Sequence, residues 1–346
     1  MGKKIIITGG AGFIGVNLAK SLLEDRGNHV LIYDNLSRKG VENNLKWLLS
    51  MKHKNLKFVE GDIRNYKKLS VTVKESDEIY HLAAQVAVTK SVEDPIEDFS
   101  INAEGTLYLL EAVRKNAPGA VFIFASTNKV YGELLHIKLR EGRTRYFPVK
   151  KKQGIDENEN LDFHSPYGCS KGTADQYVRD YFRIYGLKTV VFRQSCIYGE
   201  HQYGNEDQGW VAHFIIRSLL GRKLSIYGDG KQIRDLLDVS DLIKAYKLAA
   251  DNIEKVRGEV FNVGGGTANT FSLLELIAFL EEKLGMKIKL GFSGWRPGDQ
   301  KVFVSDNGKI KKELGWKPGV QREEGVKRLA GWIKKNIEAV KSVNKG

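Results

Sequence analysis

The feature that most constrains the fold is a set of three glycines spaced three residues apart. Gly9, Gly12 and Gly15 lie between KKIIIT at 3–8, a short β-branched run, and VNLAKSLLEDRG, whose apolar residues have helical spacing up to Gly27. Glycines in such a turn let the backbone approach a pyrophosphate, and the N-terminus of the following helix offers free N–H groups and partial positive charge. The sequence therefore predicts a strand–turn–helix unit that binds a dinucleotide.

The same pattern continues through the first half of the chain. Apolar runs alternate with stretches of helical spacing such as residues 96–116. Apolar strands that alternate with helices are typical of a parallel sheet covered on both faces. We therefore expect an α/β fold with a Rossmann-type doubly wound parallel sheet. Its next strands are HVLIYD (29–34), LKFVEGD (56–62), DEIYHLAA (77–84) and AVFIFAS (120–126).

The pattern lapses between residues 134 and 163, where the chain is charged and mostly aperiodic. A segment of this kind is a surface excursion or a lid on the substrate side. Beyond it, helices are expected at 165–186, 209–220, 239–253, 271–284 and from about 322, and strands at 188–193, 224–227, 259–264 and 287–291. We expect two intertwined lobes, with residues 1–193 plus about 235–264 as the NAD-binding domain and residues 194–234 plus about 265–346 as a smaller C-terminal lobe.

A carboxylate at the end of the second predicted strand bears on the identity of the dinucleotide. Asp34 follows the glycine turn by about 20 residues, the separation at which an acidic side chain reaches the ribose 2′-hydroxyl. Its charge would repel a 2′-phosphate, so NAD is expected rather than NADP. Arg38 keeps NADP open, because a guanidinium there can receive that phosphate.

Tyr167 and Lys171 lie four residues apart on a predicted helix that Ser165 caps and Pro166 begins, so their side chains share one face. A phenol titrates near ~10, and holding it as phenolate at neutral pH needs a shift of roughly 3 units, or about 4 kcal/mol. Lys171 and the positive nicotinamide ring are the charges that could supply this shift. With the Thr127 hydroxyl at the end of the central strand, Tyr167 is placed to act as general base and acid.

Together these motifs resemble the extended short-chain dehydrogenase/reductase family of NAD-dependent epimerases and dehydratases. TGGAGFIG, GDI, HLAA, FASTNKVYG, SPYGCSK and RDLLDVSD carry the resemblance, which spans nearly the whole chain. It implies that Thr127, Tyr167 and Lys171 are catalytic and that a nucleotide-diphosphate sugar is oxidised at a ring carbon by bound NAD. The cofactor-binding residues that it implies, besides Tyr167 and Lys171, are Gly9, Gly12, Phe13, Ile14, Asp34, Asn35, Ser37, Arg38, Asp62, Ile63, Leu82, Ala83 and Ala84.

The two residues after Thr127 bear on the reaction class. In the sugar 4,6-dehydratases of this family these positions are an acid and a base, typically Asp-Glu, which eliminate water from the ketone. Here they are Asn128 and Lys129. An amide cannot donate an acidic proton, and an ammonium is a poor base unless its pKa is strongly depressed. The sequence therefore predicts epimerisation, in which the keto-sugar turns, hydride returns to its opposite face, and NAD is tightly bound and regenerated in each turnover.

The C-terminal lobe is expected to bind the nucleotide sugar. Arg234 and Arg296 match family positions that clamp the diphosphate, and bidentate guanidinium contacts suit a group that must stay fixed while the sugar turns. Surface salt bridges are the alternative for both arginines. Asp299 is expected to take a ribose hydroxyl. Further substrate residues are expected at Gln85, Thr127, Asn128, Lys129, Gln194, Ser195, Gly209, Trp210 and Val211, the last three at the start of a helix.

Several longer strings resemble one subgroup of the family, the CDP-paratose 2-epimerases. STNKVYG, HSPYGCSKG, VVFRQS, DQGWV and GDGKQIRDLL carry this resemblance, which implies a CDP-sugar substrate. The chemistry of the predicted catalytic residues does not distinguish C2 from C4 as the inverted carbon, so a UDP-hexose 4-epimerase is the alternative. A non-catalytic NAD-binding regulator is an alternative of a different class, and the intact Thr127, Tyr167 and Lys171 argue against it.

The net charge of +13 favours anionic partners. Because 55 basic residues are interleaved with 42 acidic ones, we expect a small anionic substrate and no nucleic acid. No run of 18 apolar residues is found, so we expect no membrane span and a cytoplasmic location. Cys169 and Cys196 lack disulfide or metal-site spacing, so no metal is expected. The family resemblance implies a homodimer or homotetramer, paired through helices 96–116 and 165–186.

Overall fold

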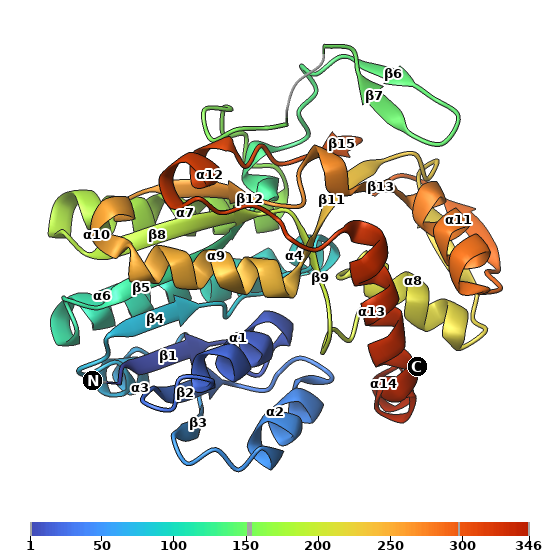
Figure 1. Cartoon of the computed structure of the whole chain (residues 1–346). Coiled ribbons are helices and arrows are strands. Elements are labelled where there is room, and N and C mark those ends of the chain that lie inside the picture. The colour runs from blue at the N-terminus through green and yellow to red at the C-terminus, as the bar shows by residue number, and fades with distance from the viewer. Residues whose placement is uncertain (1, 151–153, 297, 345–346) are drawn as a thin grey trace. The chain divides into compact units, whose positions relative to one another are not determined.

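The computed structural model describes residues 2–150, 154–296 and 298–344 (Figure 1). The chain divides into two compact units, Met1–Thr127 with Pro166–Arg193 and Ile243–Phe261, and Asn128–Ser165 with Gln194–Leu242 and Asn262–Gly346. The expected division differs at 128–165, and also at 235–242 and 262–264, all of which the sequence pattern placed with the first lobe. In the structure residues 128–165 pack with the second unit, because Tyr131 stacks on Phe303 and Ile155 pairs with Ser305.

A seven-stranded sheet forms the centre of the first unit. Its strand order is β12-β8-β5-β4-β1-β2-β3, and the pairs from β3 to β5 are parallel. The order reverses between β1 and β4, which is where open α/β sheets bind ligands. The expected doubly wound parallel sheet is confirmed. Its strands are β1 (Lys4–Thr8), β2 (His29–Asp34), β3 (Leu56–Glu60), β4 (Glu78–His81), β5 (Val121–Thr127), β8 (Lys188–Gln194) and β12 (Val260–Val263).

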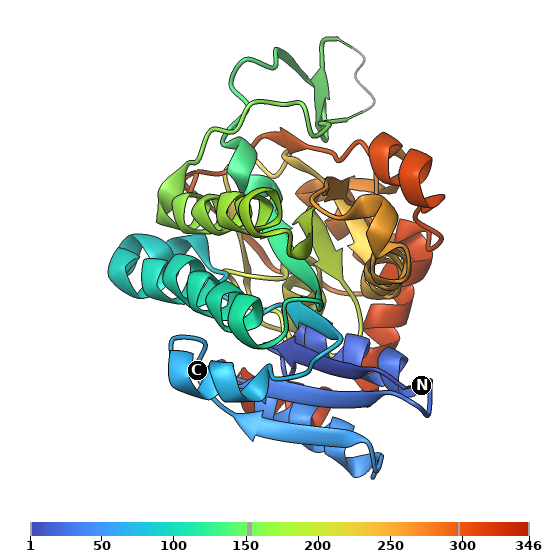
Figure 2. The same cartoon turned by 90° about the vertical axis from the view of Figure 1, so that its left-hand side faces the viewer.

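Helices cover both faces of this sheet, as Figures 1 and 2 show. On one face, α3 (Tyr66–Thr72), α6 (Gly105–Asn116) and α7 (Ser165–Tyr185) share a core with apolar strand residues. On the other face, Tyr246 of α9 (Val239–Asp251) packs against Phe192 with ring centroids 5.0 Å apart. Strand side chains alternate between faces, so the continuous apolar runs need both layers. The remaining helices of this unit are α1 (Phe13–Leu23), α2 (Val41–Ser50), α4 (Val88–Glu93), α5 (Pro95–Phe99) and α10 (Ile253–Val256).

The single helix expected at 96–116 is interrupted by a π-helical turn, Ser100–Glu104, between α5 and α6. The turn holds Asn102 fully buried, with its Nδ2 3.1 Å from both Asp98 Oδ1 and Ser170 Oγ. A π-turn accommodates one extra residue, and apolar spacing alone does not reveal it.

The second unit is built around β11 (Ile233–Asp238), whose six residues are all buried. Strands β9 (Cys196–Tyr198), β13 (Thr270–Ser272) and β15 (Val302–Phe303) pair with it, and β10 (Leu224–Tyr227) pairs with β14 (Leu290–Ser293). The expected helix 271–284 starts only at Leu273, because the residues before it form β13. The helices are α8 (Trp210–Leu219), α11 (Leu273–Leu284), α12 (Gly308–Leu314), α13 (Arg322–Lys335) and α14 (Ile337–Val343). Among the described helices of both units, none has the length and apolar character to cross a bilayer.

The segment expected to be aperiodic, 134–163, contains an antiparallel hairpin of β6 (Leu139–Glu141) and β7 (Tyr146–Pro148). An ion pair between Arg145 and Glu275 and a hydrogen bond from the Tyr146 hydroxyl to Asp229 attach the hairpin to the second unit. Its described part is therefore a docked surface excursion. Residues 151–153 of this segment lie outside the described ranges, and a lid role stays a prediction.

Candidate active site

Thr127, Tyr167 and Lys171, the predicted catalytic residues, come together in the first unit. Thr127 ends β5, and the other two occupy successive turns of α7. The Thr127 hydroxyl and the Tyr167 phenol are hydrogen-bonded. Lys171 Nζ donates to the Ala125 carbonyl at 2.7 Å and lies 4.2 Å from the centroid of the Phe124 ring. All three side chains are buried, so bulk water has little access to them.

The start of α7 differs from the expected cap. Ser165 is the first residue of the helix and has a φ of 68°, in the left-handed region that strains a residue with a Cβ. The N–H of Tyr167, in the first turn, donates to Ser91 Oγ of α4 at 3.1 Å. A side chain distant in sequence thus satisfies a helix-start donor.

A buried ion pair that the sequence reasoning missed anchors α7. Arg193 on β8 donates from Nε and Nη2 to the two carboxylate oxygens of Asp175, at 2.9 Å each, and both residues are almost fully buried. Ser126 Oγ donates to the same carboxylate at 2.8 Å, from the residue before Thr127. Asp175 lies four residues after Lys171 on the same helix face, and this spacing is the signal that could have identified it.

On the other side of α7, Gln85 belongs to an internal polar network. Its Nε2 donates to Asp98 Oδ1 and to the Ala87 carbonyl at 2.8 Å each, and its Oε1 accepts from the Ala87 N–H at 2.5 Å. Ser170 Oγ donates to the second carboxylate oxygen of Asp98. Both ends of the Gln85 amide are therefore engaged within the protein, which argues against its expected role as a substrate ligand.

The protein's own groups shift the two titratable residues away from a phenolate–ammonium pair. Burial raises the pKa of Tyr167 to about 12; the Thr127 hydrogen bond opposes this shift, and Asp98 adds to it. Burial lowers the pKa of Lys171 to about 7, against the effect of Asp175 and Asp98. Desolvation, and not the charge of Lys171, therefore sets the direction of the Tyr167 shift in the protein alone. Lys171 and the nicotinamide ring were the two charges expected to lower the Tyr167 pKa. The nicotinamide ring would be added only when NAD binds.

The glycine turn leaves no space for side chains. A Cβ on Gly9, whose φ is +68°, would lie 2.6 Å from the backbone nitrogen of Ala83, and a Cβ on Gly15 would lie 2.5 Å from the carbonyl oxygen of Gly9. Gly12 is the N-cap residue of α1, where no described side chain caps the helix and no acidic residue stands in the first turn. Phe13 and Ile14 begin that helix and are partly buried. The turn thus fits the pyrophosphate of NAD.

Asp34 ties the end of β2 to this turn. Its Oδ2 accepts from the N–H of Ala11 at 3.0 Å, and its Oδ1 accepts from that of Leu36 at 2.9 Å. Burial raises its pKa, and these two backbone hydrogen bonds counter the effect. The carboxylate therefore stands beside the glycines, as a ribose ligand requires. Arg38 is partly buried after it, and Ser37 is exposed.

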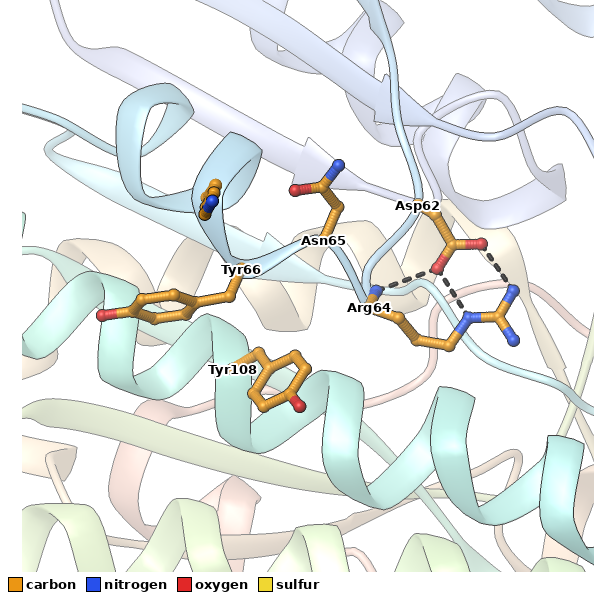
Figure 3. A pocket seen from close by; sticks show the side chains of 6 residues that line it. Asp62, Arg64, Asn65, Tyr66 and Tyr108 are labelled. Atoms are coloured by element: carbon orange, nitrogen blue, oxygen red, sulfur yellow. Dashed lines mark hydrogen bonds and ion pairs between the residues drawn. The ribbon is translucent and has the colours of Figure 1, made fainter.

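A shallow, open depression of about 620 Å³ lies at the end of β3 (Figure 3). Asn35 Nδ2 donates to Asp62 Oδ2 at 3.0 Å, which connects this depression with the end of β2. Hydrogen bonds from Arg64 lower the pKa of Asp62. Ile63, by contrast, is buried in the core, so only its backbone can face a ligand. The depression is lined by Asp62, Arg64, Asn65, Tyr66, Lys67 and Tyr108. Leu82, Ala83 and Ala84 follow β4, partly buried.

In the second unit, two predicted substrate residues form a cationic cluster. Lys129 Nζ donates to the Gly298 carbonyl at 2.9 Å and lies 4.0 Å from Asp299 Oδ1. Burial, then the charge of Arg234, lowers the pKa of Lys129 to about 8. Arg234 is buried on β11, where it donates to the Ile233 carbonyl at 2.8 Å. The guanidinium of Arg234 beside the Lys129 ammonium suits an anionic ligand, although the carboxylates of Asp299 and Glu133 offset part of the charge on Lys129.

Arg296 lies near the start of α8. Its guanidinium stands 3.7 Å from the Tyr227 ring centroid, and Nη1 donates to the Glu206 carbonyl at 2.9 Å. Gly209 is the N-cap of α8, and the side chain of Val211 is buried in the core, so Val211 can offer only its backbone N–H. Trp210 is partly buried. Within the described residues, the Nδ1 atom of His213, next along this helix face, is buried without a hydrogen-bond partner.

Two further expected substrate residues lie at the end of β8: Gln194 is its last residue, and Ser195 follows it. Ser195 Oγ donates to the carboxylate of Asp235, which also accepts from the backbone N–H of Gly266 at 3.0 Å and of Ser305 at 3.1 Å. The Ser195 hydroxyl is thus hydrogen-bonded to a buried carboxylate of the second unit. Gln194 is also buried, at the end of the strand.

Known proteins resemble this chain over almost its whole length. The family model described as GDP-mannose 4,6 dehydratase matches residues 6–329. The CDP-paratose 2-epimerase of Salmonella typhi is 47% identical over 336 residues, which are 95% of this chain and 98% of that protein.

Solved structures show the same fold. The UDP-glucose 4-epimerase of Thermotoga maritima, solved with UDP-glucose, is 35% identical with a TM-score of 0.82 and covers 96% of this chain and 99% of its own. The UDP-glucuronic acid 4-epimerase of Bacillus cereus, in complex with UDP-glucuronic acid and NAD, is 29% identical with a TM-score of 0.82 and the same coverage. The expected family and cofactor are confirmed. The chain therefore belongs to the family of NAD-dependent nucleotide-sugar epimerases and dehydratases that the GDP-mannose 4,6 dehydratase model describes.

Proposed function

We propose that this protein is an epimerase of a CDP-linked sugar, with CDP-paratose as the first candidate substrate and C2 as the inverted carbon. The observation that carries the proposal is the pair Asn128 and Lys129 directly after Thr127. The Asn128 amide cannot donate the acidic proton of elimination, and Lys129 Nζ is hydrogen-bonded to the Gly298 carbonyl, whereas the predicted redox residues are intact. The 47% identity to a CDP-paratose 2-epimerase supports the choice of base and sugar.

The catalytic residues divide the proton transfer among them. Thr127 orients the reacting hydroxyl, the Tyr167 oxygen takes its proton and later returns it, and Lys171 places a positive charge near that oxygen. Bound NAD would supply the hydride acceptor and donor for the ring carbon. Gly9, Gly12 and the start of α1 would hold its pyrophosphate, with Asp34 at a ribose. Between the two hydride transfers the keto-sugar turns its opposite face to the cofactor.

The second unit is proposed to bind the nucleotide diphosphate. Arg234 and Arg296 are the candidate diphosphate ligands, and Asp299 is the candidate for a ribose hydroxyl. The positive potential around Lys129 and Arg234 supports an anionic group there. Arg296 would exchange its present contacts with Glu206 for the ligand.

Incubation of the purified protein with CDP-paratose in deuterated solvent tests the reaction. The C2 epimer without deuterium at carbon is expected, because hydride returns from the bound cofactor. Deuterium at that carbon would indicate carbanion chemistry and contradict the proposal. NAD released on denaturation, without added cofactor, is the expected sign of tight retention.

A UDP-hexose 4-epimerase is the second candidate, because the solved UDP-glucose 4-epimerase covers 96% of this chain. A thermal-shift panel of CDP, UDP, GDP and dTDP separates the two, since a ligand that binds the native state raises its stability. A larger shift with UDP, together with turnover of UDP-glucose, would favour the second candidate.

A homodimer or homotetramer is also part of the proposal. Apolar side chains are exposed on α5 and α7, with Ile96 82% exposed, Phe99 54% and Ile184 65%. Exposed apolar side chains on the helices expected to pair support a subunit interface. Light scattering should give a dimer or tetramer, and Ile96→Glu combined with Ile184→Glu should give a monomer.

A further inference from the structure

We propose that Asn128, Lys129 and Gln300 form a brace that positions Gly298 and Asp299, next to Arg296, and that Lys129 is a positioning residue. The inference rests on the proposed function in one respect, namely that Arg296 and Asp299 are ligands of the nucleotide diphosphate. The inference assigns a structural function to Asn128 and Lys129, which stand where the dehydratases of the family have an acid and a base.

The first half of the brace is an amide bridge. Asn128 Nδ2 donates to Gln300 Oε1 at 3.2 Å, and Gln300 Nε2 donates to the Gly132 carbonyl at 2.5 Å. Gln300 is fully buried and Asn128 is 8% exposed, so water does not compete for these bonds. Both ends of the Gln300 amide are thereby bound by the turn that follows β5.

The second half of the brace is the Lys129 ammonium. It donates to the Gly298 carbonyl at 2.9 Å and lies 4.0 Å from the Asp299 carboxylate, with only 17% of its side chain exposed. The N–H of Asp299 donates in turn to the Arg296 carbonyl at 3.3 Å. Lys129 therefore contacts the Gly298 backbone and the Asp299 carboxylate. Asp299 is the predicted ribose ligand, and Arg296, a predicted diphosphate ligand, lies close to it in sequence.

The chemistry of this contact explains why an acidic pair is unsuitable here. A carboxylate at position 129 would face the Gly298 carbonyl and the Asp299 carboxylate, where like charges repel. An ionised Asp at position 128 has no donor for Gln300 Oε1, and the Gln300 amide cannot turn over without losing its bond to Gly132. Asn128 and Lys129 are thus matched to the segment at 298–300.

The decisive experiment compares hydrogen exchange of the ligand-free protein with ligand binding. In Lys129→Met, the amides of residues 298–300 should exchange at least about 10-fold faster, because a buried hydrogen bond to a charged group is worth about 1.5–3 kcal/mol. CDP should bind about 10-fold more weakly, and KM for the CDP-sugar should rise while kcat changes less. NAD content should stay the same.

Two variants serve as controls. Lys129→Arg keeps a cation that can reach the same carbonyl and carboxylate, so it should restore slow exchange and most of the CDP affinity. Lys287→Met removes an exposed lysine of the same unit and should change neither quantity. If Lys129→Met fails to fold, Asn128→Ala tests the amide bridge, with faster exchange at Gln300 expected.

Unchanged exchange at 298–300 in ligand-free Lys129→Met, together with weaker CDP binding, would overturn the brace and make Lys129 a direct ligand. Unchanged exchange at Gln300 in Asn128→Ala would overturn the amide bridge. The exchange measurement needs no substrate, so it tests the brace even if the protein turns out not to be an epimerase. Faster exchange in Lys129→Met with no turnover of any CDP- or UDP-sugar would retain the brace and reject the epimerase.

Discussion

Asp175 and Arg193 form a bidentate ion pair in the interior of the first unit, with each carboxylate oxygen 2.9 Å from a different guanidinium nitrogen. The pair joins α7 to β8, and the Ser126 hydroxyl connects it to β5. Tyr167 and Lys171 are on that helix, and Thr127 ends that strand. The relative position of the three predicted catalytic residues therefore depends on this one buried carboxylate.

Replacing the carboxylate should destabilise the protein strongly. In Asp175→Asn, the Arg193 guanidinium stays buried without its counter-charge, and breaking a buried pair in this way costs about 3–5 kcal/mol. Urea unfolding followed by circular dichroism measures the loss. Asp180→Asn, on the exposed side of the same helix, is the control and should be near neutral. Equal stability of Asp175→Asn and the parent would show that the pair does not anchor α7.

A methyl group on Gly15 should remove the cofactor. Its Cβ would lie 2.5 Å from the Gly9 carbonyl oxygen and from the Cα of Gly10, so the turn must move away from α1. We expect NAD released by denaturation of Gly15→Ala to fall at least about 10-fold, because the backbone no longer cradles the pyrophosphate. Gly331→Ala, where a Cβ meets open space on α13, should keep its NAD. A full NAD content in Gly15→Ala would count against this site.

Burial of Lys171 should make stability depend on pH. Its pKa is lowered from 10.5 to about 7, so between these values the unfolded chain binds a proton that the folded chain does not. The contribution of Lys171 to stability therefore rises with pH in this window, by about 1.4 kcal/mol per pH unit, and is constant below it. Lys171→Met removes the penalty.

Urea unfolding at pH 7 and pH 9.5 measures this effect. The advantage of Lys171→Met over the parent should be largest at pH 7 and smaller at pH 9.5. Lys46→Met, which removes an exposed lysine of α2, should show no such difference between the two pH values. An advantage that grew with pH would contradict the direction of the shift.

The sequence was sufficient to predict the elements whose signal is local. The glycine turn, Asp34, and the helix face shared by Tyr167 and Lys171 depend on spacing within one or two elements, and the structure has them as expected. Contacts between distant segments had no such signal. The bond from Asn128 to Gln300 joins residues 172 positions apart, and no periodicity reports it.

Burial accounts for other differences between prediction and structure. The desolvation that raises the pKa of Tyr167 depends on burial in the folded protein, which residue spacing does not report. Gln85 and Ser195 look like polar ligands in the sequence, but each hydrogen-bonds to a buried carboxylate, that of Asp98 or Asp235. Buried polar residues near a site find their hydrogen-bond partners inside the protein.

Removing the Tyr167 hydroxyl should abolish turnover without removing the cofactor. Tyr167→Phe keeps the ring that fills the buried position but has no oxygen to take the proton, so kcat should fall by about 10²–10⁴-fold, the contribution typical of a positioned acid–base group. The NAD content should be unchanged, because the glycine turn and Asp34 are intact. Stability should change little, since the phenol loses only its bond to Thr127. Turnover equal to that of the parent would show that another group carries the proton, and loss of NAD together with activity would place Tyr167 in cofactor binding instead.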